Sequence, residues 1–129
     1  MPIYDLAAVA EALDLTPKQL DNLLSRNHLP GVERKKRGIA RRITSDVAAV
    51  VCLARELSAA LSVPLANVLG FSQAAAIEHG AQQIELGRFT KLSIDQPALR
   101  ALVAQRLDAA VETVGRRRRG RPPRRREQN

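Results

Sequence analysis

Apolar residues recur at helical spacing along most of the chain, and this pattern predicts a mainly α-helical protein. A first helix is expected over residues 6–13, with Asp5 as its N-cap. A second is expected to begin at Thr16, whose side chain can form a reciprocal capping box with Gln19, while Pro17 fills the first helical position. The buried side of this second helix is expected to consist of Leu20, Leu23 and Leu24.

The pattern changes between residues 32 and 44. Two short strands are expected there around a tight turn at Arg37-Gly38, where glycine supplies the positive φ that such turns usually need. A third helix follows and is expected to be capped by Thr44 or Ser45. Its apolar positions are Val47, Val50, Val51, Ala54, Leu57 and Leu61. A β-hairpin is therefore predicted between two helical regions.

The next part of the chain is also predicted to be helical at first. A shorter helix is expected from residues 62–64 to near Gly70, and an alanine-rich one over about 72–79. The segment 80–93 has the weakest pattern, in which alternating apolar residues indicate extended structure and Gly87-Arg88 a turn.

A last helix is expected from its N-cap Asp95 to about Val114, with Gly115 as its stop. The apolar stripe of this helix consists of Leu99, Leu102, Val103, Leu107, Ala110, Val111 and Val114. Residues 116–129 are low in complexity and contribute nothing to a core, so they are predicted to be disordered without a partner.

Composition narrows the class of protein. With 129 residues, 45% of them hydrophobic, the chain is expected to form one compact core with appendages. It has neither an apolar run long enough to span a membrane nor the pattern of a signal peptide. Cys52 is the single cysteine, so we expect a small buried side chain, with no internal disulfide and no metal site. A cytoplasmic protein without a cofactor or an evident small-molecule ligand is predicted.

The net charge of +8 is concentrated in two segments. Eight arginines lie in residues 116–126, and six further cations lie in residues 34–42. The rest of the chain has more acidic than basic residues. Two focused basic patches on a mildly acidic body are typical of a protein that contacts a polyanion.

The first two predicted helices and the turn between them are typical of a helix-turn-helix, whose second helix enters the major groove of DNA. Asn22 can read adenine, and Lys18 can reach guanine or a phosphate. An alternative is that these residues are only the polar side of an amphipathic helix. The candidate contacts on this helix are Thr16, Lys18, Gln19, Asn22 and Arg26.

The basic hairpin favours DNA binding further. Cations along a two-stranded ribbon can follow the phosphate backbone, and Arg37 at the tip can enter the minor groove. Protection of an edge strand against aggregation explains one or two such residues, but not six. The candidate contacts in this wing are Arg34, Lys35, Lys36, Arg37, Arg41 and Arg42.

Residues 4–70 resemble the MerR and excisionase group of winged helix-turn-helix proteins. The resemblance is carried by LAAVAEALDLTPKQLDNLLSRNHLPG, the basic hairpin with ARRIT, and SDVAAVVCLARELSAALSVPLANVLG. It implies a helix-turn-helix with a β-hairpin wing and a helix packed against it. It also implies groove contacts by Lys18, Gln19 and Asn22 and wing contacts by Arg37, Arg41 and Arg42.

The arginine tail resembles the core of an AT-hook, in which a Gly-Arg-Pro segment lies extended in a narrow minor groove of A·T-rich DNA. Diffuse phosphate contact and binding to RNA or an acidic protein remain alternatives. The candidate tail residues are Arg116, Arg117, Arg118, Arg119, Gly120, Arg121, Pro122, Arg124, Arg125 and Arg126.

The last helix is expected to supply a dimer contact, because helix-turn-helix proteins usually bind two half-sites as dimers. An intramolecular core is the alternative. The candidate dimer residues are Leu99, Leu102, Val103, Leu107 and Val111. This gives a winged helix-turn-helix over 1–70, a helical dimerisation region over 71–115 and a basic tail over 116–129.

The sequence as a whole predicts a mainly α protein that binds double-stranded DNA, a transcriptional regulator of the bacterial nucleoid. A nucleoid-associated architectural protein and an excisionase-like recombination directionality factor are alternatives with the same architecture. An enzyme is not expected, because neither a convergent catalytic set nor a glycine-rich phosphate loop is visible. A single-stranded RNA module is disfavoured because the chain has only three aromatic residues, too few for a stacking platform.

Overall fold

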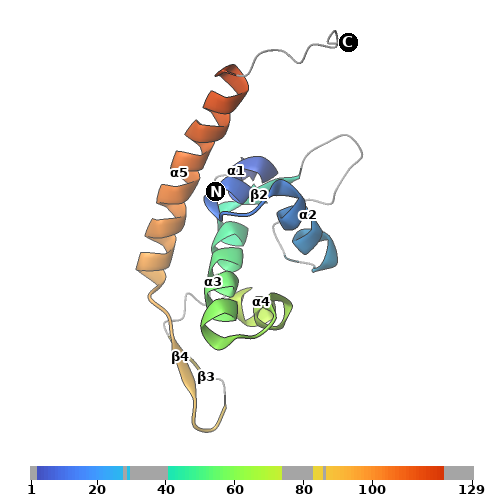
Figure 1. Ribbon diagram of the computed structural model, residues 1–129. Coiled ribbons are helices and arrows are strands. Elements are labelled where there is room, and N and C mark those ends of the chain that lie inside the picture. The colour runs from blue at the N-terminus through green and yellow to red at the C-terminus, as the bar shows by residue number, and fades with distance from the viewer. Residues whose placement is uncertain (1–2, 28, 30–40, 74–82, 86, 121–129) are drawn as a thin grey trace.

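The computed structural model describes residues 3–27, 29, 41–73, 83–85 and 87–120, with only the backbone at 84 and 116–120. The described chain is mainly α-helical, as the apolar pattern predicts (Figure 1). Its helices are α1 (Leu6–Ala12), α2 (Pro17–Arg26), α3 (Ser45–Leu61), α4 (Leu65–Gln73) and α5 (Gln96–Gly120). Its strands are β1 (Ile3–Asp5), β2 (Arg42–Thr44), β3 (Gln83–Glu85) and β4 (Lys91–Ser93).

One apolar core joins the two halves of the chain. Helix α3 packs against α4 and α5, and α1 lies between α5 and α2 (Figure 1). Leu107 of α5 is fully buried in the same cluster as Val9 of α1 and Val50 of α3. An ion pair adds to this packing, since Arg100 Nη1 of α5 lies 2.7 Å from Asp46 Oδ1 of α3. The core therefore continues across residue 70, where the sequence suggested a boundary.

Asp5 occupies the predicted N-cap position of α1, but its side chain makes no capping hydrogen bond. The end of α1 and the start of α2 follow the local sequence signals. At the end of α1, the amides of Asp14 and Leu15 donate to the carbonyls of Glu11 and Ala10, at 3.2 and 2.8 Å. Asp14 takes a left-handed conformation with φ of 59°, which completes this Schellman-type end. Helix α2 then begins with the predicted capping box between Thr16 and Gln19.

Strand β2 has a partner that the sequence did not predict. It pairs antiparallel with β1, placing Tyr4 opposite Ile43 and Asp5 opposite Arg42. The predicted hairpin had assigned residues 42–44 to its second strand. The other arm and the turn at Arg37-Gly38 lie outside the described residues, so the wing stays a prediction.

Two glycines do not end helices where the sequence analysis placed the ends. Helix α4 passes through Gly70 to Gln73, and α5 passes through Gly115 to Gly120. A glycine inside a helix costs only about 1 kcal/mol relative to alanine, and the arginines after Gly115 are strong helix formers. The prediction of disorder from residue 116 is therefore wrong for 116–120. Residues 121–129 lie outside the described part, as does most of the predicted 72–79 helix.

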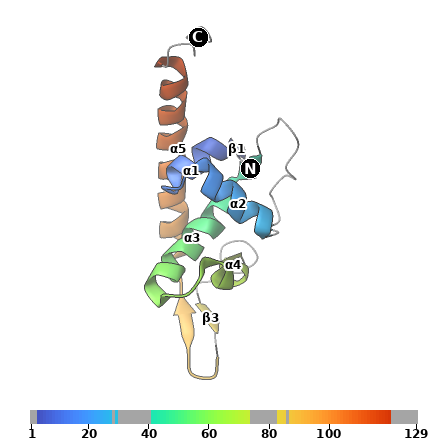
Figure 2. The same ribbon diagram turned by 45° about the vertical axis from the view of Figure 1, so that its right-hand side comes forward.

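The weakly patterned segment before α5 forms a hairpin, as its alternating apolar residues suggested. Strands β3 and β4 are antiparallel with Glu85 opposite Lys91, and the Gly87 amide donates to the Thr90 carbonyl at 3.3 Å. The hairpin projects from one end of the body, away from the C-terminal end of α5 (Figure 2). Asp95 caps α5 as predicted, with Oδ1 accepting from the Ala98 amide at 3.0 Å.

Candidate nucleic-acid interface

Helix α2 carries a polar strip on its outer side. Lys18, Asn22 and Arg26 are exposed and spaced four residues apart, so they follow one line along the helix. Leu20 and Leu24, on the opposite side, are buried in the core. The predicted division of this helix into a buried and an exposed side is therefore confirmed, with Leu23 only partly buried.

Thr16 and Gln19 are also exposed, but their polar atoms already bind the backbone. The Thr16 hydroxyl accepts from the Gln19 amide at 3.0 Å, and Gln19 Oε1 accepts from the Thr16 amide at 2.9 Å. The bond from the Thr16 amide occupies Oε1, the oxygen with which Gln19 could accept from a base. The side-chain NH2 group of Gln19 remains able to donate. Both residues primarily hold the start of α2 in place.

Arg41 has a different role from the phosphate contact that the sequence suggested. Its residue is only 8% exposed, and its Nε lies 3.3 Å from Asp21 Oδ1. Its Nη2 donates to Ser25 Oγ at 2.9 Å, and its carbonyl accepts from the Leu6 amide at 3.2 Å. Arg41 therefore joins the start of α1 to the middle of α2 from within the protein. The expected contact with DNA by this side chain is not supported.

Arg42, the next residue, is exposed and Ile43 is fully buried. This alternation follows from the extended backbone, in which successive side chains point to opposite faces. Sequence reasoning treated the two arginines alike because nothing in a run of cations distinguishes the inward one. The pairing partners Asp21 and Ser25 lie on another element.

The other predicted wing and tail contacts have no described side chains. Four of them, Arg34, Lys35, Lys36 and Arg37, lie outside the described residues, as do Arg121, Pro122, Arg124, Arg125 and Arg126. The backbone of Arg116, Arg117, Arg118, Arg119 and Gly120 forms the last turns of α5. The structure therefore brings together Lys18, Asn22 and Arg26, and places the first four tail arginines on a helix.

The apolar stripe of α5 is divided between the core and the surface. Val103 and Leu107 are buried inside one chain, which is the intramolecular alternative to the predicted dimer contact. Leu102 and Val111 are 39% and 49% exposed. They are nine residues apart, which is half a turn out of phase, so they flank the buried stripe on opposite sides. Leu99 is partly buried and packs against the core.

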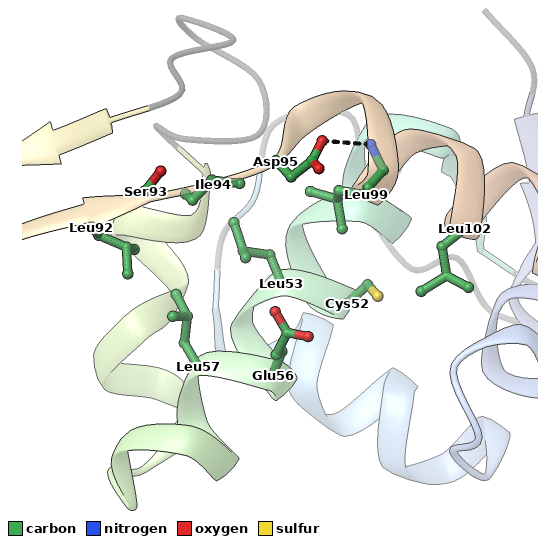
Figure 3. Close-up of a pocket in the computed structure, with 11 residues that line it drawn as sticks. Cys52, Leu53, Glu56, Leu57, Leu92, Ser93, Ile94, Asp95, Leu99 and Leu102 are labelled. Carbon is green, nitrogen blue, oxygen red and sulfur yellow. Dashed lines mark hydrogen bonds between the residues drawn. The ribbon is translucent and has the colours of Figure 1, made fainter.

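A cavity of about 330 Å³ lies between α3, β4 and the start of α5 (Figure 3). Its walls are mainly aliphatic, and Leu53, Leu92 and Leu99 converge on it from the three elements (Figure 3). Cys52 is half-buried in one wall, less buried than the sequence suggested. Burial raises the pKa of this thiol above its ordinary value, because the thiolate loses hydration; Arg106 opposes the shift, Glu56 adds to it and Arg55 opposes it. No local signal marks this cavity, since its walls come from distant segments.

Within the described ranges, we find neither a cluster of three potential metal ligands nor a helix apolar enough over sufficient length to cross a bilayer. Exposed cations and amides line one side of α2, while exposed carboxylates such as Asp14, Glu56 and Asp108 lie elsewhere on the described surface. No protein-family model, curated protein or solved structure matches this chain, so its function rests on the residues described above.

Proposed function

We propose that this protein binds double-stranded DNA through a winged helix-turn-helix and acts as a dimeric transcriptional regulator in the bacterial nucleoid. The observation that carries the proposal is the strip formed by Lys18, Asn22 and Arg26. All three side chains are exposed on a helix whose opposite side is locked into the core.

The chemistry of the strip suits the edges of base pairs. An asparagine amide can bind adenine N6 and N7 together, and lysine or arginine can donate to guanine O6 and N7 or to a phosphate. The major groove is wide enough to admit an α-helix. Arg26, at the last turn of α2, is the residue of the strip best placed to bind a flanking phosphate.

The strip on α2 is held rigidly by contacts beneath it. This rigidity favours DNA recognition over the alternative that the strip is only the polar side of an amphipathic helix. Both the capping box at Thr16 and the ion pair between Arg41 and Asp21 fix α2 at separate points. A helix held in this way loses little conformational entropy when it binds. Such support is what a groove-reading element requires.

The two basic segments supply the electrostatic part of the proposal. Arg42, the first residue of β2, is exposed, and the remaining cations of 34–42 precede it in sequence. The first four arginines of 116–126 lie on α5, and the other four follow it in sequence. In this proposal the wing holds phosphates, and the tail enters the minor groove at A·T-rich sequence once Gly120 leaves the helix and becomes extended.

The test is binding of the full chain to duplex DNA. A preferred site is first selected from random duplexes, and affinities are then measured by fluorescence anisotropy. Combining Lys18→Ala with Asn22→Ala is expected to weaken binding to the selected site by about 10–100-fold, while binding to random duplex changes less. Arg106→Ala, which removes an exposed cation on α5, is the matched control and is expected to bind normally.

Absence of duplex binding at 50 mM salt contradicts the proposal. So does unchanged affinity of the double variant for the selected site. Footprints on long DNA then separate the roles, because discrete protected sites indicate a regulator and continuous coating indicates an architectural protein.

The contribution of the tail is measured from the salt dependence of binding. If the tail neutralises about five phosphates, replacement of its eight arginines by glutamine should flatten the slope of log K against log salt by about 4–5 units. Equal slopes for the two proteins would remove the tail from the DNA interface.

A further inference from the structure

The hairpin formed by β3 and β4 presents an aromatic side chain at its tip. Phe89 is 90% exposed, more than any other large hydrophobic residue among those described. The guanidinium of Arg88 lies 5.8 Å from the centre of its ring. Full burial of a phenylalanine side chain is worth about 1.5–3 kcal/mol, so a partner that covers this ring at the tip of the projecting hairpin gains that free energy.

A site of matching size and chemistry lies at the other end of the same hairpin. The cavity between α3, β4 and α5 has a volume of about 330 Å³ and aliphatic walls. A dry cavity of about 150 Å³ lined by aliphatic and aromatic side chains can hold benzene. The cavity is therefore large enough for a phenylalanine ring and its methylene group.

We propose that Phe89 of one copy inserts into this cavity of a second copy, and that the second copy returns the same contact. Leu53, Leu92 and Leu99 form the cavity walls that a ring would touch. The occupant is thus a second copy of the chain. This inference deepens the dimeric state included in the proposed function and does not depend on the DNA contacts.

Phe89 does not fill the cavity of its own chain, because its ring is 90% exposed. Pairing of Glu85 with Lys91 holds the ring at the tip of the hairpin, while Ile94 and Asp95, which line the cavity, follow β4. A second copy can therefore supply a ring to this cavity without breaking the hairpin.

Charge favours the same occupant. Arg88 accompanies Phe89, and two acidic residues, Glu56 and Asp95, line the cavity. When the ring enters, the Arg88 guanidinium comes to the acidic rim. Arg55 and Arg106 act on the Cys52 side of the cavity, so the acidic part of its rim is the side formed by Glu56 and Asp95. The cationic tip of the hairpin is complementary to that side. Because each copy has both parts, two reciprocal contacts close a two-fold dimer.

The area involved predicts a weak dimer. Each phenylalanine buries about 150–250 Å², so the two rings supply only part of the roughly 1,200–2,000 Å² found in stable interfaces. Contact between the antiparallel hairpins must provide the rest. We expect a dissociation constant in the micromolar range.

Sedimentation of the full chain tests the proposal in 0.5 M salt without DNA. A monomer–dimer equilibrium is expected for the wild type between about 1 and 200 µM. Phe89→Ala should be monomeric at all these concentrations, with unchanged circular dichroism because its ring contributes nothing to the core. Leu61→Ala removes another exposed hydrophobic side chain, 53% exposed on α3, and should dimerise like the wild type.

Disulfide trapping locates the contact. Cys52 is the only cysteine and lines the cavity, so Thr90→Cys places a second thiol beside the proposed point of insertion and keeps the Phe89 ring. Oxidation with diamide removes two protons and two electrons from the thiol pair and reduces the reagent to its hydrazine. A covalent dimer is expected for Thr90→Cys and is expected to be absent when Cys52→Ala is added. Leu61→Cys, with Cys52 retained, should give no such dimer.

Three results would overturn the proposal. They are a wild type that remains monomeric at 200 µM, a Phe89→Ala variant that dimerises normally, and a covalent dimer that forms equally well without Cys52. If Phe89→Ala instead weakens only DNA binding, the hairpin contacts DNA and the dimer is excluded. A monomeric variant that still binds duplex DNA remains consistent with the proposed DNA contacts. The proposals of DNA binding and of dimerisation can therefore be contradicted independently.

Discussion

Arg41 and Asp21 form an ion pair at the edge of the buried side of α2, with Nε and Oδ1 3.3 Å apart. The two side chains are only 8% and 17% exposed, so water screens their attraction weakly. Ser25, one turn further along α2, accepts from the same guanidinium. This contact fixes α2 against the strand that leads out of the predicted wing.

Arg41→Ala is therefore expected to destabilise the protein. Arg41→Ala removes the hydrogen bond to Ser25 and the ion pair with the partly buried Asp21, and loss of such charged partners costs about 1–3 kcal/mol. Urea unfolding followed by circular dichroism measures the change. Its neighbour Arg42 is exposed, so Arg42→Ala should change the free energy of unfolding by about 0.5 kcal/mol or less. When equal amounts of folded protein are compared, Arg42→Ala should weaken DNA binding more than Arg41→Ala. Equal effects of the two substitutions on stability would contradict the assigned role of Arg41.

Thr16→Ala should cost about 1 kcal/mol of unfolding free energy, because it leaves the Gln19 amide without its side-chain partner. Thr16→Ser keeps the hydroxyl and should restore most of this loss. Thermal unfolding of the three proteins gives the comparison. A serine variant as unstable as the alanine variant would show that the methyl group, rather than the cap, stabilises α2.

Gly70→Ala should stabilise the protein by about 0.5–1 kcal/mol, because Gly70 lies inside α4 and a Cβ there meets no atom within 4 Å. Ala59→Gly at an exposed position of α3 is the matched reversal and should cost a similar amount. Urea unfolding reports both. A loss of stability in Gly70→Ala would indicate a left-handed helix end at this residue.

Some residues of the apolar stripe of α5 are buried and others are exposed, so replacing them with alanine should affect stability unequally. Leu107→Ala removes a fully buried side chain from the core between α1 and α3, and should cost about 2–5 kcal/mol. Val111→Ala, at a half-exposed position, should cost about 0.5 kcal/mol or less. Measurement at low micromolar concentration keeps any dimer from contributing. A Leu107→Ala loss that grows with protein concentration would place Leu107 in a contact between chains.

The sequence predicts the helices and their caps at Thr16, Thr44 and Asp95 because those signals are local, whereas Asp5 makes no side-chain cap. Thr16 and Gln19 are three residues apart, and the hydrogen bonds between them need no other part of the chain. The exposed strip on α2 follows from helical periodicity alone. A glycine marks the end of a helix less reliably. Its cost of about 1 kcal/mol at Gly70 or Gly115 is small beside the free energy gained when a whole helix packs.

The parts that were missed depend on contacts between distant segments. Strand β1 has only three residues, and its pairing of Ile3 with Thr44 leaves no periodic pattern to detect. The burial of Arg41 depends on Asp21 and Ser25, sixteen or more positions earlier in the chain. The cavity is assembled from α3, β4 and α5, so its existence is a property of the packing and cannot be found in any one stretch of sequence.

Cys52 makes the stability of the protein sensitive to alkaline pH. Burial in the cavity wall raises the pKa of the folded thiol above its ordinary value of 9.0. The unfolded chain, in which the thiol is hydrated, therefore loses its proton at a lower pH than the folded chain. The contribution to stability is fully present below about pH 9 and is lost as the pH rises toward the folded pKa.

The comparison of the wild type with Cys52→Ala isolates this effect, because the other titrating groups are common to both proteins. The difference between their free energies of unfolding should be constant from pH 7 to 8. Above pH 9 the wild type should lose stability relative to the variant. Alkylation of folded wild type by iodoacetamide at pH 8 should also be slower than alkylation of the urea-unfolded chain, since fewer thiolates are present and the wall shields the sulfur. A difference that stays flat to pH 10.5, together with equal alkylation rates, would show that the Cys52 thiol is hydrated in the folded protein.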